Sequence, residues 1–396
     1  MSKKSVRIVL EKKIPDHLIR EVESKLAYLD ERVKIGKVAP DGGWIQLELN
    51  RPLDEPAASA LKDKVIRLAN SLIRDSYEPK VKVLEDHLDR GVGFAKDPMP
   101  ALIQRKEVFK EGEGVYSLGP LLTNLINFFE REFVSVANEF GASPYRFPTL
   151  IPGRFLEKVN YFKAFPHSLS FATHLRSDLD VIEDFSQHAH CGETGLSTDL
   201  HSFAQIQNLL SPAVCYHLYY SLMDQRLPSD SLTATAVGNC FRYESSNMDS
   251  LERLWNFSMR EIIFIGSKQF VLEKRESARK RMEKFFETIG LAYRVESAND
   301  PFFIGEFKQA AFQNAFQLKY EIRASLPYKN STLAVGSYNY HQDFFGRHLN
   351  ITLPDDSFVH TGCIAFGLER MALAYLAQFG LEPENWAEVT ARSCHE

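Results

Sequence analysis

The sequence lacks the marks of several protein classes. No run of 18 apolar residues is present, so we expect no membrane-spanning helix. The first residues, MSKKSVRIVLEKK, show no signal-peptide pattern. Cysteine is scarce, and the five residues are odd in number and widely scattered, which argues against a disulfide framework and for a reducing compartment. These absences favour a cytoplasmic protein with no membrane partner.

The charge balance and the lack of nucleophile motifs argue against two further classes, dedicated nucleic-acid binders and enzymes with a catalytic nucleophile. Residues 1–96 carry 19 basic and 16 acidic side chains, whereas the remaining 300 residues carry 28 and 36. A dedicated nucleic-acid binder usually has a clearer basic excess, so RNA is not the favoured partner. No Ser-His-Asp or Cys-His signature of nucleophilic catalysis is evident. The chain is 44% hydrophobic and 25% charged, as is typical of a globular protein with two or three domains.

Two parts with different patterns follow one another. Residues 1–90 alternate strand-like and helix-like stretches and predict a small N-terminal α+β module, with VRIVLEK and GWIQLELN as strands and KVKVLED as a candidate third strand. Residues 91–112, with GVG, DPMP and EGEG, predict a linker. Residues 113–396 contain many strand-like runs without regular alternation with helices. This pattern predicts a largely antiparallel sheet with flanking helices, and therefore an α+β fold.

Residues 239–266, NCFRYESSNMDSLERLWNFSMREIIFIG, carry the most informative pattern. The two ends alternate like strands, and Asn, Asp and Ser fill the middle, so the stretch predicts an antiparallel hairpin with a long loop. Arginines stand at both ends beside an aromatic ring. Guanidinium groups bind phosphate oxygens and a ring covers a flat base, so the pattern fits a phosphorylated purine. A surface hairpin with ordinary ion pairs is the alternative.

Residues 239–266 resemble the second signature motif of class II aminoacyl-tRNA synthetases, and AFGLERMALA, residues 365–374, resembles the third. Residues 140–152, ending in RFPTLIP, fit the first motif, which in that class builds a dimer interface. YFKAFPHS, SPAVCYHLYY and GSYNYHQDFFG resemble the zinc-dependent, methanogen-type seryl-tRNA synthetases and their truncated relatives, the amino acid:[carrier protein] ligases. The resemblance covers about residues 100–396 and implies the synthetase-like antiparallel sheet and a homodimer.

The resemblance implies that five residues bind ATP. Arg242 would bind the α-phosphate, Glu244 would lie on the adenine side and Phe257 would stack on the adenine. Arg253 would reach the outer phosphates and Arg370 would clamp the γ-phosphate. Adenylate formation is in-line attack of a carboxylate on the α-phosphorus and depends on positioning and charge stabilisation, so Arg242 and Arg370 would be the catalytic residues.

The resemblance also implies one zinc ion per chain. Cys215, on a predicted strand, Glu261 and Cys363 match the family's zinc ligands. The open fourth position of a tetrahedral zinc would take the substrate's α-amino group. The alternative for each cysteine is a small core residue.

Three further groups of residues have weaker support. His188, His190 and Cys191, in QHAHCGE, could bind metal, but no second Cys/His pair has finger-like spacing, so a polar loop is favoured. Asn339 matches a position that lines the amino-acid pocket in the family. Mg²⁺ is expected to enter with ATP. Seryl-type enzymes often carry a magnesium-binding glutamate where this sequence has Leu333 and Ala334, so Glu321 is considered as a candidate carboxylate in its place.

The predicted helix over residues 267–289 is rich in Lys and Arg. Carrier proteins are typically acidic, so this helix could dock one through Arg275 and Arg279. A solvated helix face would explain its charge equally well.

The resulting prediction is an ATP-dependent ligase that activates a small amino acid as aminoacyl-adenylate and transfers it to the phosphopantetheine thiol of an acidic carrier protein. A seryl-type aminoacyl-tRNA synthetase is one alternative, although residues 1–90 would form a small and weakly basic tRNA-binding domain, which makes tRNA the less favoured acceptor. A non-catalytic, amino-acid-sensing paralogue is another, although a sensor would not need the phosphate-binding arginines.

Overall fold

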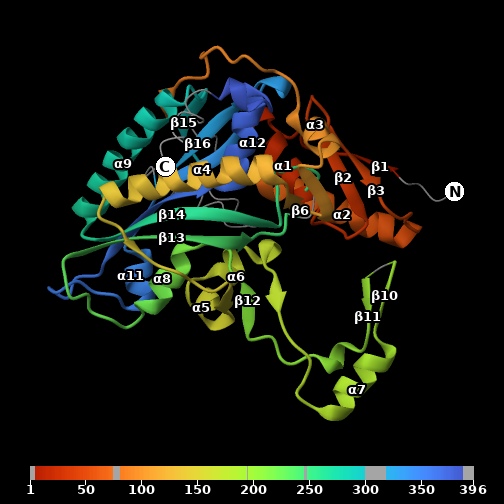
Figure 1. The fold of residues 1–396 in the computed structure, drawn as a ribbon. Helices are drawn as coiled ribbons and strands as arrows, with labels where there is room; N and C mark the ends of the chain where they lie inside the picture. The colour runs from red at the N-terminus through yellow and green to blue at the C-terminus, as the bar shows by residue number, and fades with distance from the viewer. Residues whose placement is uncertain (1–4, 75–80, 194, 245–247, 299–317, 387–396) are drawn as a thin grey trace.

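The computed structural model describes residues 5–74, 81–193, 195–244, 248–298 and 318–386. A small N-terminal module, a body built around one large sheet and an arm that projects from the body are distinct in Figure 1. None of the helices in these ranges combines the length and the hydropathy that crossing a membrane requires.

The body is built on an eight-stranded sheet. Neighbouring strands are antiparallel except β13 and the two-residue β7, which are parallel. The predicted α+β fold with a largely antiparallel sheet is therefore confirmed. In spatial order the strands are β4 (Val83–Asp86), β15 (Tyr293–Ser297), β16 (Lys319–Leu326), β17 (Ser331–Gln342), β18 (His360–Gly367), β14 (Asn256–Gly266), β13 (Ser231–Phe241) and β7 (Ser143–Pro144).

The predicted hairpin in residues 239–266 is present as part of β13 and β14. These strands pair over 11 residues each, from Ser231 opposite Gly266 to Phe241 opposite Asn256. Successive side chains of a strand point to opposite faces of the sheet. The pair therefore contributes to a hydrophobic core on one face and to a polar site on the other.

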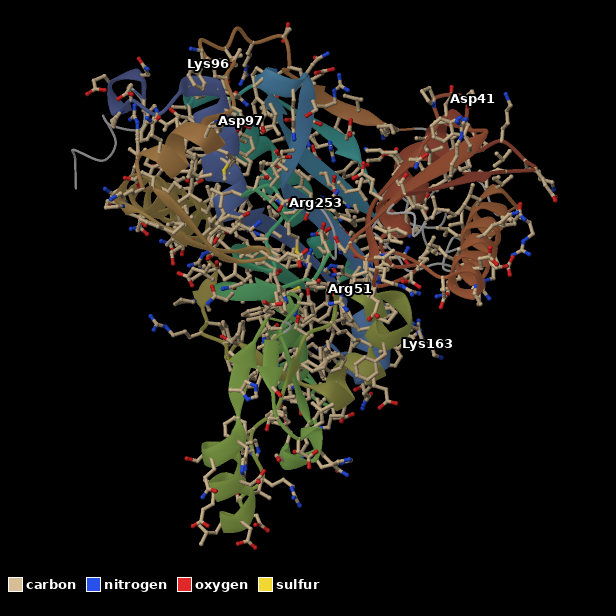
Figure 2. All side chains as sticks on the ribbon, turned by 90° about the vertical axis from the view of Figure 1, so that its right-hand side faces the viewer. Asp41, Arg51, Lys96, Asp97, Lys163 and Arg253 are labelled. Atoms are coloured by element: carbon tan, nitrogen blue, oxygen red, sulfur yellow. The ribbon has the colours of Figure 1, made fainter. Side chains whose placement is uncertain are left out.

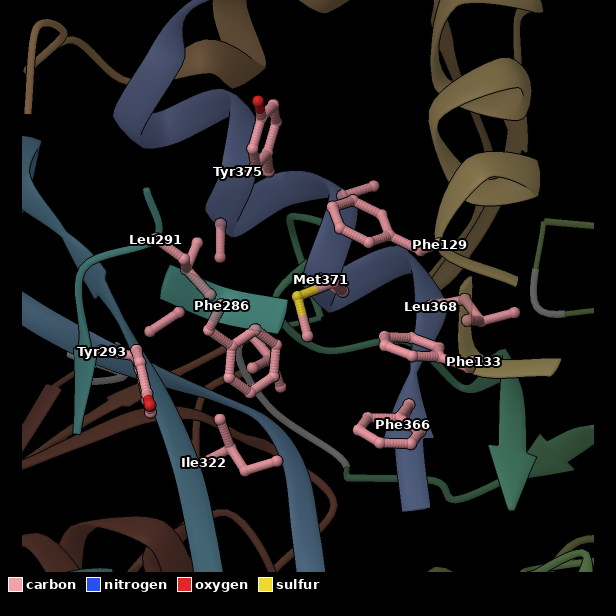
Figure 3. Packing of buried hydrophobic residues seen from close by; sticks show 14 of the residues in the cluster. Phe129, Phe133, Phe286, Leu291, Tyr293, Ile322, Phe366, Leu368, Met371 and Tyr375 are labelled. Atoms are coloured by element: carbon pink, nitrogen blue, oxygen red, sulfur yellow. The ribbon is translucent and has the colours of Figure 1, made fainter. Parts of the chain in front are cut away.

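Long helices cover one face of the sheet, and the main hydrophobic core lies between them and the strands (Figure 3). Aromatic rings fill this core: Phe133 stacks on Phe366 with ring centroids 3.9 Å apart, and Phe129 meets Tyr375 edge-on. Shorter helices pack a second core against the other face. The long helices are α4 (Pro120–Glu139), α9 (Lys268–Thr288) and α12 (Leu368–Phe379), and the shorter ones are α5 (Gly153–Lys158), α6 (Tyr161–Ala164), α8 (Cys215–Ser221) and α11 (Phe344–Leu349).

The N-terminal module has its own three-stranded sheet and its own core. The sequence pattern did not indicate one of its strands, β2. The candidate third strand, KVKVLED, is instead β4, which pairs with β15 of the body. The strand itself is confirmed, but its assignment to the module is wrong, because a strand pattern does not specify the partner strand. The elements of the module are β1 (Ser5–Val9), α1 (Asp16–Leu26), β2 (Val33–Val38), β3 (Trp44–Leu49) and α2 (Glu55–Arg74).

The predicted linker, residues 91–112, is packed into the body. Met99, Leu102 and Val108 are buried in the main core. The glycines and prolines of this segment therefore mark short connections between packed elements. The two-domain division, 1–90 and 113–396, stays a proposal. Residues 83–86 of the first range form β4, which pairs with the body, and the predicted linker packs into the body through its buried residues. The segment and its continuation form α3 (Pro98–Gln104), β5 (Val108–Gly112) and β6 (Val115–Leu118).

The arm, residues 173–206, projects away from the body in both Figure 1 and Figure 2. No hydrophobic residue described between Ala164 and Leu209 is buried, so the arm is not built around a core. Its main elements are α7 (Leu179–His188), β10 (His190–Gly192) and β11 (Gly195–Ser197), and a small sheet at its base contains β8 (Leu150–Pro152), β9 (Phe171–Ala172) and β12 (Asn208–Leu210).

Candidate active site

A pocket lies on the face of the sheet opposite the long helices. On β18, Ile364 and Phe366 belong to the main core, whereas Ala365 and Gly367 line the pocket. Small residues in this row leave room above the sheet for a ligand. Four of the five residues predicted to bind ATP line the pocket, namely Arg242, Glu244, Phe257 and Arg370, and so does Glu321, the candidate carboxylate for Mg²⁺.

Arg242 and Phe257 form one side of the pocket. The guanidinium carbon of Arg242 lies 5.5 Å from the centroid of the Phe257 ring. Its Nε donates a hydrogen bond to the carbonyl oxygen of Pro212 at 3.0 Å. These contacts orient a planar cation beside a flat aromatic surface, which suits a phosphate group attached to a purine nucleoside.

Two further arginines lie close to Arg242. Arg253 pairs with Glu244 at 3.1 Å, and Nη1 of Arg370 donates to the carbonyl oxygen of Ala334 at 3.4 Å. Burial lowers the pKa of Arg370, Glu244 raises it, and the positive charges of Arg242 and Arg253 lower it. Cations held this close repel one another, so a bound polyanion would stabilise the arrangement. Figure 2 shows Arg253 in the central part of the molecule.

A buried cluster of metal-ligating side chains lies on the same sheet. Cys215, Glu261 and Cys363 each place one ligand atom within 4.8 Å of the other two. They are 4%, 1% and 3% exposed. Glu261 and Cys363 lie on β14 and β18, whereas Cys215, predicted on a strand, is the first residue of helix α8. The fold thus brings together the three residues that the resemblance singled out.

The donor atoms of this cluster fit a divalent cation. Oε1 of Glu261 accepts the backbone N–H groups of Val214 and Cys215 at 3.0 and 3.3 Å, whereas Oε2 is buried without a hydrogen-bond partner. Burial raises the pKa of the Glu261 carboxyl and of the Cys215 thiol. A cation would counter both shifts because it stabilises the deprotonated ligands. Two sulfurs and one carboxylate oxygen also match a zinc site with an open fourth position.

Asn339 and Glu321 lie on neighbouring strands of the pocket face. Nδ2 of Asn339 donates to Sγ of Cys363 at 3.4 Å, which places this residue beside the metal-ligating cluster. Lys319 stands opposite Asn339 in the β16–β17 register and lines the pocket. Glu321 forms ion pairs with Arg323 at 2.8 Å and with Lys319 at 3.4 Å. As a magnesium ligand, Glu321 would share its carboxylate with these cations.

Known proteins with similar sequences support the functional interpretation. The family model "tRNA synthetase class II core domain (G, H, P, S and T)" matches residues 207–379. Amino acid--[acyl-carrier-protein] ligase 1 of Bradyrhizobium diazoefficiens is 31% identical over 293 residues, which are 73% of this chain and 87% of that protein. The chain belongs to this ligase family.

Serine--tRNA ligases are similar to this member of the family over a longer stretch. The type-2 serine--tRNA ligase of Methanocaldococcus jannaschii is 26% identical over 384 residues, 93% of this chain and 68% of that protein. A solved structure with a similar fold is the crystal structure of A. aeolicus tRNASec in complex with M. kandleri SerRS. Its matching chain superposes on this chain with a TM-score of 0.71 and 19% sequence identity, over 99% of this chain and 77% of that chain. This likeness confirms the class II synthetase fold.

Glu369 is a pocket residue of this family member that the sequence analysis did not single out. It is 8% exposed and lines the pocket beside Arg370. Both its carboxylate oxygens lie 2.9 Å from the backbone N–H of Ser258, so Glu369 fixes the start of α12 to β14. Burial raises its pKa. Its place in the motif GLER was the signal that could have identified it.

Arg275 and Arg279, the two residues of helix α9 that were predicted to dock a carrier protein, make contacts within the body. The helix packs in the main core, on the face of the sheet opposite the pocket. Arg279 is 15% exposed and pairs with Glu85. The guanidinium of Arg275 lies over the rings of Tyr320 and Tyr340, at 5.3 and 5.7 Å from their centroids. The positions of these two arginines therefore do not support the docking role.

A polar loop was predicted for the stretch QHAHCGE. In the structure this stretch contains the end of helix α7 and the strand β10. His188 ends α7 and its Nδ1 lies 2.9 Å from a carboxylate oxygen of Asp184, whereas His190 and Cys191 belong to β10. Within the described parts of the chain, these residues are not among the groups whose ligand atoms converge.

Glu85, His87 and Glu283 form a second convergent group among the described residues. Arg279 pairs with both glutamates of this group. A guanidinium already balances their charge, which disfavours a metal ion there.

Proposed function

We propose that this protein is an ATP-dependent amino acid:[carrier protein] ligase. It activates a small amino acid as aminoacyl-adenylate and transfers it to the phosphopantetheine thiol of an acidic carrier protein. The observation that carries this proposal is the 31% identity to an amino acid--[acyl-carrier-protein] ligase over 87% of that protein. A pocket with phosphate-binding arginines on the same sheet as a cluster of metal ligands supports it.

In the first step, an oxygen of the amino-acid carboxylate attacks the α-phosphorus of ATP, and the bond to pyrophosphate breaks. Arg242 holds the α-phosphate, and Phe257 stacks on the adenine beside Glu244. Arg253 and Arg370 bind the outer phosphates and stabilise the charge that builds up on the leaving pyrophosphate. The positive charges of Arg242 and Arg253 act against that of Arg370, so a bound polyanion would stabilise the three arginines, which favours this assignment.

Cys215, Glu261 and Cys363 would hold one Zn²⁺, which would offer its open position to the α-amino group of the substrate. Asn339, which donates a hydrogen bond to Cys363, would line the amino-acid side of the site. Acids without a free amine would lack this anchor and would be poor substrates. Glu321 is the candidate carboxylate for the Mg²⁺ that accompanies ATP.

In the second step, the thiol sulfur of the carrier attacks the carbonyl carbon of the adenylate. The bond to the phosphate oxygen breaks, AMP leaves with that electron pair, and the thiol proton passes to solvent. The contribution of the protein is to orient the two reactants, and no protein nucleophile takes part.

The test is an acceptor assay. The purified protein is incubated with labelled amino acid, ATP, total tRNA and a panel of holo carrier proteins, after amino-acid-dependent ATP–pyrophosphate exchange has identified the substrate. We expect label on a carrier protein and none on tRNA. Label on tRNA alone would replace this proposal, and a lack of any exchange would favour a non-catalytic, amino-acid-sensing paralogue.

Seryl-tRNA formation is the second candidate. The match to a type-2 serine--tRNA ligase extends over 93% of this chain, which favours this candidate because the match must reach into the N-terminal module. The weakly basic charge of residues 1–96 argues against it, because tRNA binding depends on phosphate neutralisation. Serine-dependent exchange together with tRNA charging would establish it.

A homodimer and a cytoplasmic location complete the proposal. The class II motif in residues 140–152 supports the dimer, since this motif builds the dimer interface in the class. Analytical ultracentrifugation tests it, and a single species at the monomer mass of 45.2 kDa would contradict it.

A further inference from the structure

One short turn contacts both halves of the proposed site. Residues 211–214 connect β12 to α8. The carbonyl oxygen of Pro212 accepts the Nε–H of Arg242 at 3.0 Å. Two residues later, the backbone N–H of Val214 donates to Oε1 of Glu261 at 3.0 Å. The arginine proposed for ATP and the carboxylate proposed for zinc are therefore held by one turn.

Buried hydrogen bonds hold this turn in shape. Ser211 is 2% exposed, and its Oγ donates to the carbonyl oxygen of Ala213 at 3.0 Å. Nε2 of His217 lies 2.9 Å from the same Oγ. The hydroxyl has a single hydrogen, which goes to Ala213, so the imidazole is the donor in this contact. The carbonyl of Ser211 also accepts the N–H of Phe241, the residue before Arg242.

Packing leaves the turn little room to move. His217 is 7% exposed, and its ring stacks on Phe147 with centroids 5.6 Å apart and 16° between the planes. On the other side, Val214 approaches Gly238 of β13 so closely that a Cβ at this glycine would lie 3.3 Å from Val214 Cγ2. A displacement at one end of the turn is therefore transmitted to the other end.

We infer that the turn 211–214 couples metal binding to ATP binding, and that His217 is the positioning residue on which the coupling depends. The inference rests on the proposed function, because it takes Glu261 as a zinc ligand and Arg242 as an ATP ligand. A bound cation would give the Glu261 carboxylate and the two thiolates a common partner, so that the carboxylate would hold the N–H of Val214 in a fixed place. The carbonyl of Pro212 then holds Arg242 in the orientation that the α-phosphate requires.

Coupling of this kind is reciprocal. The factor by which zinc tightens ATP binding equals the factor by which ATP tightens zinc binding, and such factors are commonly about 5–150-fold. The link here consists of a few hydrogen bonds through one turn, so we expect the lower part of this range, about tenfold.

Two binding measurements on the full-length protein test the coupling. Calorimetry gives the Kd of ATP for the zinc-loaded and the chelator-treated protein, and competition with a chelator gives the Kd of zinc with and without ATP. We expect the same factor, about tenfold, from both. If both ligands bind but neither changes the other's Kd by more than about twofold, this inference is wrong while the proposed function stands. If the protein binds neither ATP nor zinc, both this inference and the proposed function are wrong.

Substitutions at His217 test its role. His217→Leu removes the donor, and we expect both ligands still to bind but the coupling factor to fall towards one. His217→Gln retains an N–H near the position of Nε2 and should restore the coupling. The matched control is His348→Leu, which replaces an exposed histidine on α11 and should behave like the wild type.

Ser211→Ala removes the acceptor of the same hydrogen bond and gives the same readout if His217→Leu does not fold. Wild-type coupling in a folded His217→Leu or Ser211→Ala variant, or a His217→Gln variant as uncoupled as His217→Leu, would overturn the assignment.

Discussion

Among single side chains, Arg370 gives the most direct test of the proposed ATP site. Burial lowers the pKa of its guanidinium, Glu244 opposes this shift, and the nearby Arg242 and Arg253 add to it. Arg370→Ala removes a cation that would stabilise the departing pyrophosphate, and such a loss commonly costs ~2.7–4 kcal/mol, or about 10²–10³ in rate. We expect amino-acid-dependent ATP–pyrophosphate exchange to fall by that factor. Arg347→Ala, at an exposed ion pair with Asp343, is the control and should retain exchange. Exchange within a few fold of wild type would remove Arg370 from the site.

Cys215 tests the metal site. We expect Cys215→Ser to weaken zinc binding by more than about 10–100-fold, the loss that follows removal of even an outer partner of a metal ligand. Metal analysis after dialysis against a chelator measures the effect. Cys191→Ser is the matched control, because Cys191 is an exposed free thiol outside the cluster. Full zinc content in Cys215→Ser would place the metal elsewhere, and the stretch with His188 and His190 would be tested next.

The ion pairs of Arg279 tie helix α9 to the edge of the sheet. Arg279 is 15% exposed and pairs with Glu85 of β4, which is 5% exposed, and with Glu276 and Glu283 of its own helix. Removing one partner of a buried ion pair commonly costs ~3–5 kcal/mol. We therefore expect Arg279→Met to lower the free energy of unfolding in urea by that order. Lys280→Met, on the exposed face, should change it by less than about 0.5 kcal/mol. Equal effects of the two substitutions would show that Arg279 does not tie the helix to β4.

Local patterns in the sequence predicted the elements whose contacts are local. The hairpin of β13 and β14 and the helix α9 follow from periodicity and turn residues alone. Cys215 was misplaced because CYHLYY is a short, nearly continuous apolar run, and periodicity does not separate a buried strand from a buried helix in such a run. For α9, a run of basic residues gave no indication that Arg275 and Arg279 would face the sheet while their neighbours face solvent.

Contacts between distant parts of the chain could not be predicted from such patterns. The hydroxyl of Tyr293 on β15 bonds to Glu85 on β4 across 208 residues, and no local feature of KVKVLED selects that partner. The cluster of Cys215, Glu261 and Cys363 is similar in this respect. Only the resemblance to a known family indicated it, because ligands this far apart in sequence carry no spacing signal.

The N-terminal module meets the body at His167. The ring of Tyr28, just after α1, lies edge-on to the imidazole with centroids 5.0 Å apart. Burial lowers the pKa of His167 to about 4, from an ordinary value of 6.5, with a further lowering by Lys25 and an opposing effect of Glu244. The folded protein therefore binds this proton less readily than the unfolded chain does. Stability is lost as pH falls from about 6.5 towards 4.

Stability as a function of pH tests this contact between module and body. Between pH 7 and pH 5 we expect the wild type to lose on the order of 1–2 kcal/mol more than His167→Phe, which has no proton to bind at this position. Urea unfolding of both proteins across this range measures the difference. The same loss in both would show that His167 is not held neutral by the fold.

The position of β4 has a consequence for how the catalytic part of the chain behaves when it is alone. In the eight-stranded order β4 stands at one end, so its backbone caps β15. Cleavage after residue 90 would remove this strand together with the N-terminal module. β15, with five residues, would then replace the four-residue β4 as the edge strand. A longer row of unpaired N–H and C=O groups is a better template for strands of other molecules. We therefore expect residues 83–86 to limit the aggregation of this sheet by ending it in a short strand.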